Sequence, residues 1–123
     1  MFLILEKESN RYNKKTDNEA LLTLFHFLKE SWFFKELKDI EDDIAKGIER
    51  FIMPMTILTV LDDNKFKISY NLDESDTDTE FIISKDLLWD AITKYKNCGS
   101  SNFGWKKMAI NFDGKKFDIK VEN

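Results

Sequence analysis

The sequence lacks most of what disulfide-rich, membrane-spanning or loop-dominated proteins need. It contains one cysteine, Cys98, so it cannot form an intrachain disulfide, which fits a reducing compartment. No apolar run approaches the ~20 residues that span a bilayer, and the first residues lack the features of a signal peptide. Four glycines, one proline and no internal repeat argue against a loop-dominated or repeat protein. These absences predict a cytoplasmic protein with no membrane segment.

Arginine and histidine are also scarce. Arg11 and Arg50 stand beside seventeen lysines in a chain of net charge −4, which disfavours direct nucleic-acid binding and phosphoryl transfer. His26 and Cys98 are the single members of their types, and apolar neighbours favour a structural histidine over a Cys–His dyad. No paired catalytic constellation is visible, so we expect no enzyme activity, no metal and no cofactor.

What the chain has in plenty is core-forming material. Of its 123 residues 42% are hydrophobic, including eleven phenylalanines and three tryptophans. A chain of this length should bury roughly two-thirds of the surface that it exposes when unfolded. We therefore expect a single folded domain over residues 1–123.

The first third of the chain predicts a strand and then a helix. Phe2–Glu6 alternates weakly and predicts a short strand, and the polar segment Ser9–Asp17 predicts a surface loop. Thr16 and Glu19 have the spacing of a capping box. A helix is therefore expected from about Asn18 to Glu30.

A second helical pattern extends from about Lys35 to Phe51, and Pro54 prevents it from continuing much further. Met55–Leu61 is dense in aliphatic residues and predicts a central strand. Three further elements are expected: a half-buried strand from Phe66 to Leu72, a short strand Phe81–Ile83, and a helix Lys85–Lys96 capped by Ser84.

The last eighteen residues from Trp105 predict a β-hairpin around Asp113-Gly114, which is a strong turn signal between alternating apolar runs. A two-residue turn would pair Ile110 with Phe117, Met108 with Ile119 and Lys107 with Lys120. One side of this ribbon is apolar and must be covered. The element order predicts an α+β domain: N-terminal helices, an antiparallel β-meander and a C-terminal hairpin, with helices packed on one face.

Five carboxylates crowd into eight residues between the meander strands: Asp73, Glu74, Asp76, Asp78 and Glu80. They do not form a calcium loop, because Phe81 and Leu87 stand where an EF-hand needs glycine and glutamate. Two interpretations remain, a solvated loop or an acidic docking surface. The outer face of the second helix poses the same choice, with Glu36, Asp39 and Asp43.

From Met55 to Glu122 the order of elements resembles the YezG-like immunity proteins of bacterial polymorphic toxin systems. In residues, the resemblance lies in Trp105, Gly114, Lys115, Phe117 and Asp118 of the hairpin. This chain departs from the family in having an extra lysine in the turn, no aromatic acidic ending, and a longer helical first half. The resemblance implies an inhibitor that binds a cognate toxin domain, often a nuclease.

The hypothesis that follows is a partner-binding surface made of the carboxylates named above, which would occlude the basic groove of a toxin. Three other classes stay open on sequence grounds. They are a phage-encoded DNA mimic that inhibits a host defence nuclease, a non-catalytic adaptor, and an enzyme whose site the sequence hides.

Overall fold

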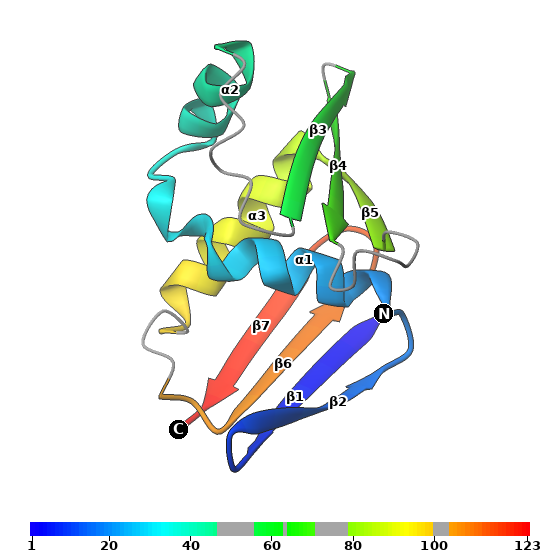
Figure 1. Cartoon of the computed structure of the whole chain (residues 1–123), viewed down its shortest axis with the longest axis vertical. Helices are drawn as coiled ribbons and strands as arrows, with labels where there is room; N and C mark the ends of the chain where they lie inside the picture. The colour runs from blue at the N-terminus through cyan, green and yellow to red at the C-terminus, as the bar shows by residue number, and fades with distance from the viewer. Residues whose placement is uncertain (47–55, 63, 71–78, 100–103) are drawn as a thin grey trace.

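The computed structural model of the chain describes residues 1–46, 56–62, 64–70, 79–99 and 104–123. Within these residues the strands form two antiparallel sheets (Figure 1). The four-stranded sheet has the order β2 (Arg11–Thr16), β1 (Phe2–Glu8), β6 (Lys107–Phe112), β7 (Phe117–Glu122). The three-stranded sheet has the order β3 (Thr56–Asp62), β4 (Lys65–Tyr70), β5 (Thr79–Ser84). The helices are α1 (Ala20–Lys29), a 3-10 turn η1 (Ser31–Phe33), α2 (Leu37–Ala45) and α3 (Lys85–Asn97). The predicted α+β class, meander and hairpin are confirmed.

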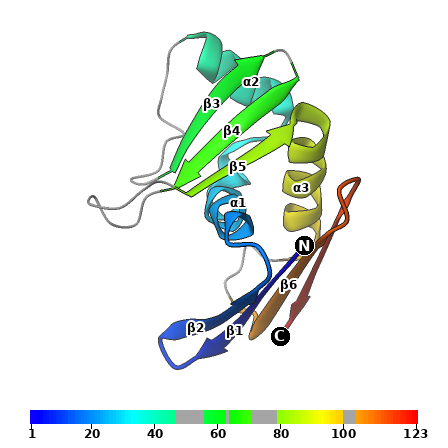
Figure 2. The ribbon, with the colours of Figure 1, turned by 90° about the vertical axis from the view of Figure 1, so that its right-hand side faces the viewer.

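The helices α1 and α3 lie between the two sheets (Figure 2). α1 packs against β4 and β5 on one side and β1 on the other, and α3 packs against β7 and β5. This position explains why α1 buries Thr23 and Phe27 in addition to the stripe of Leu21, Leu24, Phe25 and Leu28. A helix with partners on both sides must be apolar nearly all round. Each sheet thus has one face on the shared core and one outer face.

The C-terminal hairpin is confirmed, but its predicted register is wrong by two residues. Phe112 pairs with Phe117 and Ile110 with Ile119, so the turn contains four residues, Asp113 to Lys116. A type I′ turn needs positive φ at both central residues, and only Gly114 has it, at 93°. Asp113 Oδ1 instead accepts the backbone N–H groups of Lys115 and Lys116, at 2.8 and 3.0 Å. The shift by two keeps every side chain on its predicted face.

The predicted loop at Ser9–Asp17 is wrong, because most of it forms β2. Glu8 pairs with Arg11, so Ser9 and Asn10 make a two-residue hairpin turn in which Ser9 has a φ of 56°. Serine is a rare choice for that conformation, and β2 buries almost nothing. Neither hydrophobic alternation nor a glycine therefore marked this hairpin in the sequence.

The capping box predicted at Thr16 is also wrong. Thr16 Oγ1 accepts the N–H of Asn18 at 3.0 Å, and Asn18 Oδ1 accepts the N–H of Ala20 at 2.9 Å. These short-range turns compete with helix geometry and delay the helix to Ala20. Glu19 does not reach back; its carboxylate binds Lys14 at 2.8 Å.

The predicted helix over Lys35–Phe51 is described only as far as Lys46, where α2 covers Leu37–Ala45 and buries Ile40. The prediction for α3 is confirmed: Ser84 Oγ accepts the N–H of Leu87 at 3.3 Å. Asp90 of α3 accepts the N–H of Phe117 at 3.2 Å, which fixes the start of β7 against the helix. Among the described helices none is long and apolar enough to cross a membrane.

The strand predicted over Met55–Leu61 is confirmed from Thr56 onward as β3, Met55 lying outside the described residues, but its predicted central position is wrong. The centre of the three-stranded sheet is β4, and β3 is an edge. β3 buries only Thr56 and Leu58, because the helices cover one face of this sheet and not its far end. The aliphatic residues of β3 are therefore partly exposed on the outer side of the sheet, and the strand is not buried on both faces.

Candidate protein-binding surface

The outer face of the three-stranded sheet exposes aliphatic side chains. Strand alternation turns Leu58, Ile68 and Phe81 into the core and their sequence neighbours outward. Ile57 on β3 is 46% exposed and Ile82 on β5 is 59% exposed. Figure 2 looks onto this face, and no labelled helix lies in front of it. We call the following set the aliphatic face: Ile57, Thr59, Lys67, Glu80 and Ile82. Ser69 lies in the same register position on β4 but is only 7% exposed.

One ion pair lies within the aliphatic face. Lys67 Nζ on β4 and Glu80 Oε1 on β5 are 3.5 Å apart, with about a third and a half of their side chains exposed. Lys67 also stands directly between Thr59 and Ile82 in the cross-strand row. The face therefore combines two exposed isoleucines with one ion pair whose charges offset each other.

The end of β3 near Asp62 exposes further aliphatic side chains, with Val60 on the inner side of the sheet in one row with Phe66 and Ile83. Four consecutive residues, Thr59 to Asp62, are exposed, including Val60 at 42% and Leu61 at 47%. The pairing with β4 shifts between Val60 and Asp62, which places a bulge at Leu61. Of the seven large hydrophobic side chains exposed in the described part of the chain, four belong to this small sheet. Such clustering is informative, whereas single exposed hydrophobic residues are ordinary.

The carboxylates predicted on the second helix lie on α2 and just before it. Asp39 Oδ2 accepts the backbone N–H groups of Lys35 at 2.8 Å and Glu36 at 3.1 Å. These two hydrogen bonds hold the pKa of Asp39 below its ordinary value. Asp39 thus fixes the start of α2, whereas Glu36 is exposed and Asp43 partly exposed.

The structure does not bring all the predicted carboxylates together. Glu80 points outward on the aliphatic face, while α2 lies behind that sheet in Figure 2. Glu36, Asp39 and Asp43 therefore sit on the opposite side of the three-stranded sheet from Glu80. Four other predicted residues lie outside the described residues: Asp73, Glu74, Asp76 and Asp78.

Charge is nevertheless unevenly distributed along the sequence. The segments 1–16 and 105–123, which supply the four-stranded sheet, contain nine basic and five acidic residues, a net charge of +4. Residues 17–104, which include the helices and the three-stranded sheet, contain ten basic and eighteen acidic residues, a net charge of −8. We call these the basic layer and the anionic part. The described residues of the anionic part contain nine basic and twelve acidic residues, a net charge of −3. Every predicted partner-binding carboxylate belongs to the anionic part.

His26 has a packing role in the structure. Its ring stacks on Tyr70 with centroids 3.9 Å apart and an interplanar angle of 7°. Burial, aided by the charges of Lys29 and Lys14, lowers the pKa of His26 from 6.5 to about 4. The ring is therefore neutral near pH 7. Cys98 Sγ, the other half of the dyad considered above, donates to the carbonyl of Tyr95 at 3.1 Å.

Other possible sites carry less chemistry. A shallow pocket of about 270 Å³ lies at the turn of the C-terminal hairpin, beside Met1 and Lys116. One of its carboxylates, Asp113, has its pKa lowered by the hydrogen bonds that it accepts from the backbone N–H groups of Lys115 and Lys116. Among the described residues no group of three His, Cys, Asp or Glu side chains is placed to hold a metal ion.

Sequence reasoning missed the exposed aliphatic residues of this surface. A signal was present: in Thr56–Leu61 neither alternating set of side chains carries a charge. That pattern has two explanations, a strand buried on both faces or an edge strand with an apolar outer side. Length and composition favoured a strand buried on both faces, whereas the structure shows an edge strand with an apolar outer side.

Comparison of this chain with protein-family models, with curated proteins and with solved structures finds no match. Its function must therefore be argued from the surface itself.

Proposed function

We propose that this chain is an immunity protein that binds and neutralises a cognate bacterial toxin domain in the cytoplasm. The observation that carries the proposal is the charge separation between a basic layer of net charge +4 and an anionic part of net charge −8. A partner with a basic surface is attracted to the anionic part and repelled by the basic layer, so it approaches in a defined orientation.

A nuclease toxin has the matching surface. Enzymes that hold nucleic acid contact phosphates with lysine and arginine, so their active-site grooves are basic. An acidic protein that covers such a groove competes directly with the substrate. Close charge pairs at protein interfaces couple by roughly 1.5–7 kcal/mol, which supports tight binding when apolar anchors accompany them.

The aliphatic face supplies apolar anchors beside the charges. Ile57 and Ile82 are exposed on the same face as Glu80. Interface energy is concentrated in a few desolvated side chains, and the surrounding polar contacts add specificity and speed of association. The two features therefore support one mechanism, in which charge guides the encounter and apolar contact retains the partner.

The first test is coexpression with the protein encoded by the adjacent reading frame. If the proposal holds, that protein arrests growth alone, and coexpression of this chain restores growth and yields a complex that copurifies. Failure to bind or to restore growth would overturn the proposed function. Copurification with a host defence nuclease would support a DNA mimic instead.

The second test asks whether the predicted carboxylates guide association. The variant D73N/E74Q/D76N/D78N removes four negative charges from the anionic part. A matched control, E6Q/E8Q/D118N/E122Q, removes four from the basic layer. At low salt the first variant should associate with the toxin about tenfold more slowly and with a weaker salt dependence. Equal association rates for the two variants would show that association depends on the net charge of the chain and not on where the carboxylates lie.

A further inference from the structure

The four edge strands of the two sheets differ in how they discourage unwanted pairing. β2 carries Arg11, Lys14 and Lys15, and β7 carries charged residues at every second position. Charged edges of this kind resist pairing with other strands. β5 carries Glu80 and runs directly into α3, with which it is in contact.

β3 is the exception. Its only charged residue is Asp62 at its end, and the segment Thr56–Leu61 is a run of Thr, Ile, Leu and Val. Within the described part of the chain no strand pairs with its outer edge. The bulge at Leu61 ends the regular ladder, so a stretch of five residues, Thr56–Val60, remains geometrically regular. That stretch is about 16 Å long and can pair with a short extended segment.

We propose that β3 is a strand-addition site for a partner segment that is aliphatic in its centre and carries lysine or arginine at its ends. The inference rests on the proposed function, because it names the part of the toxin that this chain binds. Backbone hydrogen bonds to Thr56–Val60 provide the pairing, and Ile57 contacts the outward side chains of the added strand.

The charges around β3 favour a basic-ended segment over a second copy of the chain as the partner of this edge. Two copies paired through β3 would bring two regions of net charge −8 together, which opposes association. A basic-ended strand instead meets Asp62 at one end of β3, within a segment of net negative charge. The second copy is therefore disfavoured by the same charges that attract a basic segment.

The test uses synthetic peptides and the ¹⁵N-labelled full-length chain. One ten-residue peptide has a central Val-Thr-Val-Ile-Val-Thr run with Lys-Arg at both ends, and its matched control has Glu-Asp at both ends. The basic-ended peptide should shift the amide resonances of Thr56–Val60 and should bind about tenfold more tightly at low salt than the acidic-ended one. A third peptide, with proline in its centre, should not bind because it lacks the paired donor.

Two variants separate the edge of β3 from edges in general. I57K adds a positive charge to β3, and N13K adds one to the exposed edge strand β2. I57K should weaken the basic-ended peptide about tenfold, and N13K should leave its affinity within about twofold. I57E should bind the basic-ended peptide more tightly than I57K does, because glutamate at this position attracts the basic ends. Retained amide spectra of all three show that the fold is intact.

Three results would overturn the proposal: no shifts in β3 at millimolar peptide, equal binding of both charged peptides, or shifts confined to β2. Sedimentation as a dimer that I57K converts to a monomer would overturn it as well, in favour of a second copy. None of these measurements uses a toxin. Their failure therefore leaves the coexpression test standing, and failure of coexpression leaves the peptide result standing.

Discussion

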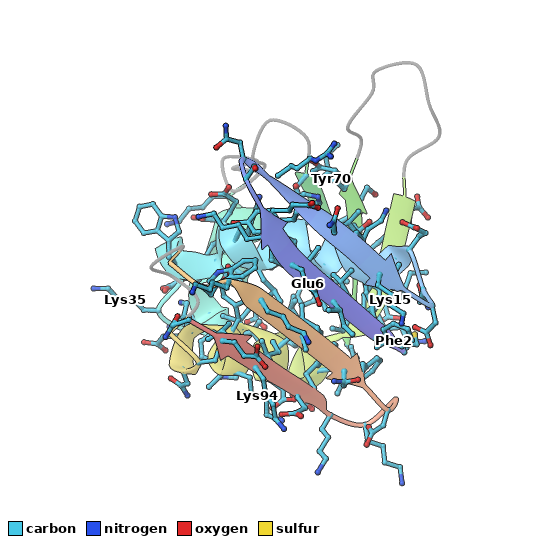
Figure 3. All side chains as sticks on the ribbon, turned by 90° about the horizontal axis from the view of Figure 1, so that it is seen from below. Phe2, Glu6, Lys15, Lys35, Tyr70 and Lys94 are labelled. Atoms are coloured by element: carbon cyan, nitrogen blue, oxygen red, sulfur yellow. The ribbon has the colours of Figure 1, made fainter. Side chains whose placement is uncertain are left out.

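The outer face of the four-stranded sheet includes a charged row, whereas the outer face of the three-stranded sheet exposes two isoleucines beside one ion pair. Asn13, Glu6, Lys107 and Glu122 form one row across all four strands of the larger sheet. Glu6 and Lys107 are 3.8 Å apart in that row, and Figure 3 looks onto this face, with Glu6 and Lys15 labelled. The corresponding row in the smaller sheet is Thr59, Lys67 and Ile82.

The outer faces of the two sheets therefore differ in composition, although the inner faces pack on the same core. Opposite charges alternating across strands keep a sheet soluble and specify its register without favouring any partner. An apolar outer face and an uncharged edge strand neither keep an isolated protein soluble nor specify the register of its sheet. Their presence in the anionic part, and not in the basic layer, is the reason for proposing the binding surface there.

The largest expected effect comes from the core beneath the larger sheet. Ile110 is fully buried, so I110A should lower the free energy of unfolding by about 3 kcal/mol. I57A on the aliphatic face should change it by less than about 0.5 kcal/mol, because that side chain is half exposed. Urea unfolding of both variants measures the contrast. A loss at Ile57 comparable to that at Ile110 would mean that the aliphatic face is covered in solution.

The next effect lies where α1 meets the smaller sheet. Because His26 has a pKa of about 4 when folded and 6.5 as a free side chain, the folded state binds its proton less readily. Stability is therefore lost as pH falls from 6.5 towards 4. After solvent screening of this partly exposed ring, the loss should be about 1–2 kcal/mol.

The variant H26Q isolates this contribution, since glutamine cannot be protonated. Unfolding free energies measured near neutral pH and near pH 4 should fall further for the natural chain than for H26Q. Parallel curves for the two proteins would show that the stack of His26 on Tyr70 does not depend on a neutral imidazole.

A smaller effect is expected at the junction of β5 and α3. Ser84 caps α3 through its hydroxyl, so S84A should destabilise the chain by about 1 kcal/mol. S84D retains an acceptor at the same position and should recover most of that loss. Thermal unfolding compares the two, and equal losses would exclude capping as the role of Ser84.

The smallest effect concerns the ion pairs of the two outer faces. Lys67–Glu80 and Glu6–Lys107 are both exposed, so each pair should couple by less than about 0.5 kcal/mol in a double-mutant cycle. Against a basic partner the two should differ, because E80Q removes a charge from the aliphatic face and E6Q does not. Equal association rates for E80Q and E6Q would contradict the assignment of the binding face.

The sequence predicted elements wherever a local signal was strong. Ser84 marked α3, the alternation around Phe66 and Ile68 marked β4, and Asp113-Gly114 marked the hairpin. It failed at β2, whose turn uses serine at positive φ, and at the length of the C-terminal turn. Both failures occur where side chains accept backbone N–H groups or where almost nothing is buried, so periodicity carried no information.

The candidate surface was less predictable than the fold. Glu80 and the α2 carboxylates are visible as charges in the sequence, but their placement on opposite sides of the smaller sheet is not. Asp39 looked like a surface charge and instead holds the start of α2. The segment that contains Ile57 looked like a central strand, because an aliphatic edge strand and a buried strand have the same composition.

By itself, then, the sequence determined the local elements, the α+β class, and the amounts of charge and apolar surface to be distributed. These depend on neighbours in the chain, through capping, turn chemistry and alternation. Only the tertiary structure decided that two sheets enclose α1 and α3, that β3 lies at an edge, and that the basic and acidic segments separate. Such outcomes depend on which distant strands pair, as when Leu3 on β1 meets Ile110 on β6, and no local signal specifies that pairing.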